Sequence, residues 1–273
     1  MIQYFIYVVQ VLGLTLGVMA VCGLVAWFAR RVFMYLVGDS ARGIYYASSI
    51  VGTPVHELGH ALMCIPFAHR IIDMKLLTFP KDRSRTLGYV QHSYKRKNQW
   101  AAFGELFISF GPIFSGLGVM ILVLTLCFPT QWNAYRETSR MLVESGASVK
   151  DCLLSVFSLL LSLFSGFKEN LVPSLIGIFI ILSVSQHITL SFADLKGCLK
   201  AFLMYTGGVI VFAAVTMLLG WRGVVVSALN RFNLRLLSIF CIAMAFSLVW
   251  VIIGVVVFIL RWTHVTLDEA IDD

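Results

Sequence analysis

The sequence has 273 residues, of which 59% are hydrophobic and 13% charged, with a formal net charge of +7 and a mean hydropathy of +0.88. A chain this apolar is not a soluble domain, and its composition indicates an all-α polytopic protein of the lipid bilayer. Basic residues of such proteins mark the cytoplasmic face of the membrane, so the positive charge does not indicate nucleic-acid binding.

Six stretches are close to the ~20 residues that a helix needs to cross a bilayer. The first is too long for the apolar region of a cleavable signal peptide and lacks its basic start, so we expect a retained span or signal anchor. The whole chain, 1–273, is expected to form a single integral membrane domain. The six spans are expected at about 4–28, 43–66, 100–128, 171–190, 201–220 and 237–260.

An H-E-x-x-H motif, His56 to His60, lies in the second predicted span. Residues four apart lie on one face of a helix, so the two histidines can bind one zinc ion while Glu57 reaches a water on that ion. Charged residues within a span cost roughly 2.5–3.5 kcal/mol each, which favours a functional role over ordinary histidine packing. We therefore expect one Zn²⁺ per chain, with Glu57 as the general base.

A basic stretch from His69 to Trp100 follows the motif and is predicted to be cytoplasmic. Within it we expect a membrane-associated β-hairpin over 70–95, with strands at 71–79 and 86–94. Two interpretations of the hairpin stay open. It could pair with an extended substrate strand, or it could be a connector whose basic side chains contact anionic lipid.

Alternating spans place both chain ends inside and an extracytoplasmic loop at 129–170. Its apolar part, 152–167, is expected to be an interfacial or re-entrant helix. The protein is thus expected in the cell membrane, with its site toward the cytoplasm.

A third zinc ligand is needed, because a catalytic zinc ion normally has three protein ligands and an open position for water. The candidates are Asp194, His187 and Glu105. Asp194 is preferred, because the span before it is expected to end at the depth of the motif. His187 precedes Asp194 by two helical turns, about 10 Å, so both cannot bind one ion if the helix is continuous. A His187 that is not a ligand would face the cavity or bond a backbone carbonyl.

Small residues are concentrated in the third predicted span, among them Gly111, Pro112 and Ser115. Small residues let helices approach closely in lipid, and Pro112 frees a carbonyl group while it bends the helix. This segment could serve helix packing alone, or its bend could also shape the wall beside the zinc ion.

Together these motifs resemble those of the site-2-protease-like intramembrane metalloproteases. Residues 52–62 resemble the zinc helix of that family, and 110–115 are similar to its G-P-x-x-N stretch, with Ser115 at the position of the asparagine. Residues 193–197 fall where its aspartate-glycine motif is expected, with Gly197 three residues after Asp194. The resemblance covers a catalytic core of about 43–199. It implies zinc-dependent cleavage of transmembrane protein substrates. No PDZ-like or CBS-like regulatory domain is expected, and the sequence does not identify a regulatory membrane partner.

Two other functions stay open beside hydrolysis of peptide bonds in or near transmembrane segments. One is a catalytically inactive zinc-binding scaffold or transport-associated protein, whose metal would have four protein ligands. The other is a different class of membrane metalloprotease with Glu105 as the third ligand. In the hydrolytic mechanism, Glu57 takes the proton of the attacking water and later delivers it to the leaving amine.

Overall fold

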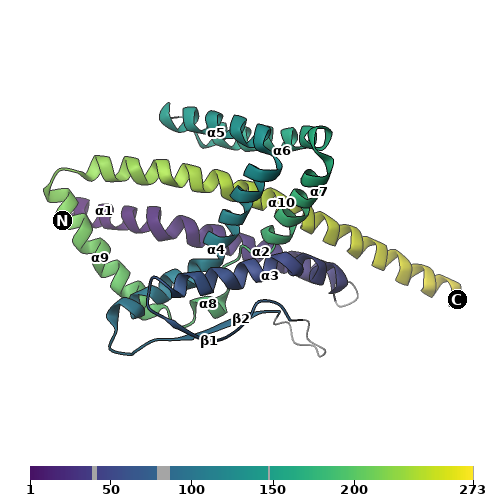
Figure 1. Ribbon diagram of the computed structural model, residues 1–273, viewed down its shortest axis with the longest axis horizontal. Coiled ribbons are helices and arrows are strands. Elements are labelled where there is room, and N and C mark those ends of the chain that lie inside the picture. The colour runs from purple at the N-terminus through teal and green to yellow at the C-terminus, as the bar shows by residue number, and fades with distance from the viewer. Residues whose placement is uncertain (39–41, 79–86, 147, 273) are drawn as a thin grey trace.

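The computed structural model of the protein describes residues 1–38, 42–78, 87–146 and 148–272. It is a mostly helical structure with one small antiparallel sheet, as predicted (Figure 1). The elements are α1 (Ile2–Leu12), the π-helical turn η1 (Gly13–Gly17), α2 (Val18–Val37), α3 (Arg42–Cys64), β1 (Arg70–Lys75), β2 (Tyr89–Ser93), α4 (Gln99–Cys127), α5 (Pro129–Glu144), α6 (Val149–Glu169), α7 (Leu171–Ser185), α8 (Phe192–Leu195), α9 (Leu199–Leu218) and α10 (Arg222–Asp272).

Five helical segments of the described chain are long and apolar enough to cross a membrane. The coarse prediction of a multi-helix membrane protein is therefore confirmed, but the set of candidate spans differs from the predicted six. The motif helix α3 does not meet these criteria, because it carries the polar and ionisable residues of the motif. The five segments are Ile2–Val37, Gln99–Cys127, Val149–Glu169, Leu199–Leu218 and Arg222–Thr263.

Helices α6 and α7 account for the other differences from the predicted spans. Helix α6, which lies within the predicted loop 129–170, is apolar enough to span. Ser155, Ser162 and Ser165 each donate to a carbonyl of their own helix at 2.7 Å, so these hydroxyls need no water. Helix α7 has only 15 residues and ends at Ser185, and the buried residues that follow it are not helical.

Helices α3 and α4 pack against each other at a glycine contact. The backbones of Gly59 and Gly111 touch, so that a Cβ atom on either residue would overlap the other helix. One turn further, Ser115 Oγ donates to Val55 O at 2.8 Å. The small residues of the predicted third span therefore bring α4 directly against the motif helix.

A non-helical segment, 186–191, passes between three helices at positions occupied by glycines. Gly23 of α2 faces Leu190, Gly52 of α3 faces the His187 ring, and Gly116 of α4 faces Ile188. The segment is largely buried, and its end leads into the short helix α8. Because these three glycines have no side chain, a segment of irregular backbone fits in the interior of the helical bundle.

The hairpin follows α3 and lies alongside it (Figure 1). Strands β1 and β2 pair antiparallel, with Ile71 opposite His92 and an irregularity between Ile71 and Asp73. Both strands are shorter than predicted, and the predicted turn at 80–85 lies outside the described residues. At the start of β2, Gly88 rests against α3.

Substitution of Gly111 by alanine should destabilise the protein, because its methyl group would overlap the backbone of Gly59. Overpacking of this kind costs about 1–3 kcal/mol, which thermal denaturation in detergent should show as a lower midpoint. Gly118→Ala is the matched control on the same helix, since its Cβ would meet open space. It should leave the midpoint unchanged or raise it, because alanine favours a helix over glycine. Equal effects of the two substitutions would contradict the packing argument.

Candidate metal centre

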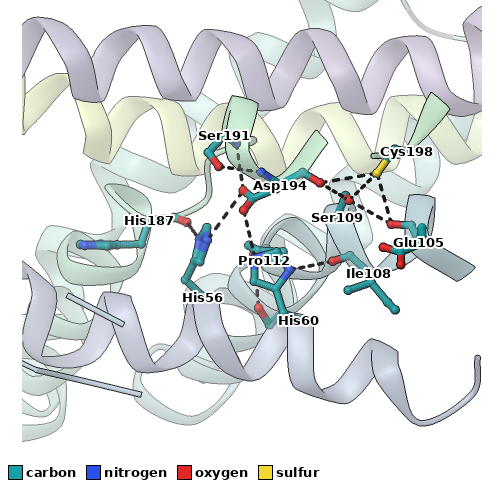
Figure 2. A network of polar contacts seen from close by, with 11 residues as sticks. His56, His60, Glu105, Ile108, Ser109, Pro112, His187, Ser191, Asp194 and Cys198 are labelled. Atoms are coloured by element: carbon teal, nitrogen blue, oxygen red, sulfur yellow. Dashed lines mark hydrogen bonds and ion pairs between the residues drawn. The ribbon is translucent and has the colours of Figure 1, made fainter. Parts of the chain in front are cut away.

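His56, His60 and Asp194 converge although Asp194 lies far from the motif in sequence (Figure 2). His60 Nε2 is 3.5 Å from Asp194 Oδ1, and His56 Nε2 is 4.0 Å from Asp194 Oδ2. Donors about 2.0–2.1 Å from a tetrahedral zinc ion would be separated by ~3.3 Å, so these spacings are close to those of a ligand set. The three side chains are 12–15% exposed, so the group is largely buried but still accessible to solvent.

Both histidines have the tautomer that a metal ligand needs. His56 Nδ1–H donates to His187 O and His60 Nδ1–H donates to Ile108 O, each at 2.8 Å. A carbonyl oxygen can only accept, so both Nδ1 atoms carry a proton. In the neutral rings the lone pairs therefore lie on the Nε2 atoms, which face Asp194. Metal-binding histidines in proteins are oriented in this way by a backbone carbonyl or a carboxylate.

The acceptor for His60 is supplied by Pro112. In a helix, the N–H of residue 112 would bond to the carbonyl of Ile108, but proline has no N–H group. The predicted free carbonyl is therefore that of Ile108, and it holds the imidazole of His60. Pro112 thus acts on the metal group through a backbone bond.

Asp194 is fixed by a capping box at the start of α8. Ser191 N–H donates to Asp194 Oδ2 at 3.0 Å, Asp194 N–H donates to Ser191 Oγ at 3.1 Å, and Ser109 Oγ donates to Asp194 O. Burial alone would raise the pKa of the Asp194 carboxyl, but the His60 and His56 rings together with Ser191 lower it to about 2. The carboxyl is therefore ionised at neutral pH, as metal binding requires.

Glu57 lines a cavity of about 220 Å³ beside the two histidines and Asp194. Its side chain is 8% exposed and lies against the hairpin, since a Cβ on Gly88 would be 2.8 Å from Glu57 Cγ. Glu57 is therefore nearly buried between α3 and the hairpin. The cavity is lined by Arg30, Tyr45, Thr53, His56, Glu57, Leu87, Gly88, His187, Thr189, Ser191 and Asp194.

Arg30 is a cavity residue that the sequence analysis did not identify. It extends from α2, where its guanidinium donates to the Tyr45 hydroxyl and lies over the Tyr45 ring. Arg30 and Tyr45 also line a larger adjoining pocket of about 570 Å³. No motif marks Arg30, because its place beside the cavity depends on how α2 packs against the rest of the chain.

The two other candidate ligands do not join this group. The His187 carbonyl faces His56, but its ring points away and stacks on Tyr45 (Figure 2). Its Nε2 lies 3.4 Å from both Ser49 Oγ and Thr53 Oγ1. Glu105 groups instead with His69 and His92, a second cluster of metal-binding residue types that the sequence analysis missed. The sequence signal that could have revealed this cluster is a histidine near each end of the predicted hairpin, His69 and His92.

Comparisons of the chain with protein-family models, curated proteins and solved structures found no match.

Asp194→Asn should remove one equivalent of bound zinc per chain, because a neutral amide is a poor zinc ligand. Metal analysis after zinc loading and desalting measures this. Asp151→Asn is the matched control: Asp151 forms the same capping box with Ser148 at the start of α6, and no histidine is grouped with it. Unchanged zinc in Asp194→Asn would remove this residue from the metal centre.

Pro112→Ala should weaken the zinc affinity of this centre about 10–100-fold, because the new N–H competes with His60 for Ile108 O. Competition against a chromophoric chelator would measure the affinity of the zinc equivalent that Asp194→Asn removes. The denaturation midpoint of metal-free protein should stay unchanged or rise, since alanine restores a helix hydrogen bond. An unchanged affinity would show that Pro112 serves packing alone.

Proposed function

We propose that this protein is an intramembrane metalloprotease that hydrolyses peptide bonds in or near transmembrane segments of protein substrates. The main support is the orientation of His56 and His60, whose Nε2 lone pairs face the Asp194 carboxylate. The three-residue group fits a zinc ion, and the proposal agrees with the family that the motif resembles. Metal identity, hydrolysis, substrate class and a location in the cell membrane are all parts of this proposal.

Zinc held by His56, His60 and Asp194 would polarise the scissile carbonyl and lower the pKa of a water toward ~7. Glu57 lies in the same cavity, next to His56 in the chain. In the proposed reaction its carboxylate accepts the proton of the attacking water and later donates it to the leaving amine. The guanidinium of Arg30 adds a positive charge to the cavity wall, where it would stabilise negative charge developing on the carbonyl oxygen.

The substrate is proposed to reach the cavity through the adjoining pocket of about 570 Å³. The two spaces share Arg30, Tyr45, Thr189 and Ser191, so an extended peptide in the larger one would reach the smaller one. The pocket is lined mainly by α2, together with Tyr45 of α3 and the segment 186–191. A helical substrate would have to unwind before entry, because the carbonyls of a helix are already hydrogen-bonded.

A purely structural metal site is less well supported by the donor set. Such a site has four protein ligands, whereas the group formed by the described residues has three. A third ligand from Glu105 is also not supported, because Glu105 belongs to the other cluster. An open fourth position is what hydrolysis requires.

Glu57→Gln should retain bound zinc but lower peptide-bond cleavage by about 10²–10⁴-fold, because the amide cannot accept the proton of water. Purified protein in proteoliposomes with a library of single-span membrane peptides would be incubated in ¹⁸O-water. Mass spectrometry would then identify new carboxyl ends that carry the label. Glu144→Gln, a change in an exposed ion pair with Arg140, is the control and should behave as the wild type. Labelled ends produced equally by Glu57→Gln would end the proteolytic proposal.

A further inference from the structure

His69, His92 and Glu105 form a cluster that the proposed reaction does not use. They come from three parts of the chain: His69 from the connection between α3 and β1, His92 from β2, and Glu105 from α4. One donor atom of each residue lies within 4.8 Å of the other two. The hairpin is thereby joined at its base to the helix that supports the first metal group.

The orientation of His69 makes a lone pair available in this cluster. Its Nε2–H donates to Ala101 O at 2.8 Å, and a carbonyl can only accept, so Nδ1 carries no proton in the neutral ring. That Nδ1 faces His92 Nδ1 at 2.9 Å, and the two rings meet edge to face. Ala101 is one helical turn before Glu105, so the bond also fixes His69 to the turn that carries the carboxylate.

This arrangement repeats the features of the first group: two imidazoles, one carboxylate and a backbone carbonyl that orients a ring. We propose that His69, His92 and Glu105 bind a second divalent metal ion, of the kind that accepts nitrogen and oxygen ligands, such as Zn²⁺. The proposal does not depend on hydrolysis at the first centre.

The histidine pair requires only a small adjustment to hold an ion. Two nitrogens bound to one zinc ion are ~3.3 Å apart, so the histidine pair would open by a few tenths of an ångström. Without metal, the same pair is joined by a hydrogen bond from His92 Nδ1–H to His69 Nδ1. The alternative is that the cluster serves only to form this hydrogen bond and binds no metal ion.

A metal ion bound by these three residues would fix the position of the hairpin beside the cavity. The strand that carries His92 begins next to Gly88, which rests against Glu57. Glu105 and Ile108 are on adjacent turns of α4, and Ile108 O holds His60. The second ion would therefore stabilise two of the surfaces that surround the first centre, the hairpin and the start of α4.

Metal counting on the full-length protein tests the proposal. Purified protein would be stripped with a chelator, reloaded with Zn²⁺, desalted and measured for metal and protein. The wild type should bind two zinc ions per chain, and His92→Ala and Asp194→Asn should each bind one. The double variant should bind none. Gln91→Ala, a change of the neighbouring exposed residue on β2, should keep two.

One zinc ion in the wild type, unchanged in His92→Ala, would overturn the second site and leave the first intact. Loss of all zinc in Asp194→Asn would overturn it as well. His92→Cys guards against a variant that fails to fold: with Co²⁺ it should show a thiolate-to-cobalt charge-transfer band that the wild type lacks. Absence of that band would also contradict the proposal. Cleavage is not measured in any of these experiments, so their failure is separate from failure of the protease proposal.

Discussion

The candidate metal centre depends on two backbone carbonyls that are not used by a helix. An imidazole on a helix rotates about its side-chain bonds, and its Nε2 is aimed only when Nδ1–H is held. For His60 the acceptor is Ile108 O, which is free because Pro112 lacks an N–H group. For His56 the acceptor is His187 O, which lies beyond the end of α7. Two different interruptions of helical hydrogen bonding therefore place both lone pairs toward one carboxylate.

Interrupted backbone is costly inside a membrane protein, because every buried polar group needs a partner. Here the free groups become partners of side chains, and glycines provide the space for them. Gly52 and Gly116 admit the segment 186–191, and the contact between Gly59 and Gly111 brings Ile108 within reach of His60. A bulky residue at any of these positions would separate the carbonyls from the rings, even though none of the glycines touches a ligand atom.

The parts of this site that depend on residues close together in the sequence could be predicted. The parts that depend on packing between distant segments could not. The spacing of His56 and His60 indicates a shared helical face, and Pro112 indicates a free carbonyl. The group that this carbonyl would meet lies 48 residues away, and the acceptor for His56 lies 131 residues away from it. The predicted span 171–190 also extended past Ser185, because the sequence does not show that the buried residues 186–190 leave the helix. Arg30 and the cluster of His69, His92 and Glu105 were missed for the same reason, because only the packing of distant segments brings these residues into place.

The position of the hairpin bears on how a substrate strand would approach the proposed active site. Gly88 lies against Glu57, so the hairpin covers the Glu57 side chain from one side. On another side the cavity shares Arg30 and Tyr45 with the larger pocket beside α2. A second metal ion bound at His69 and His92 would fix the hairpin in this position. Entry from the α2 side would then bring an extended substrate along Arg30 and Tyr45 toward Glu57, so that Arg30 and Glu57 could act on the same scissile bond.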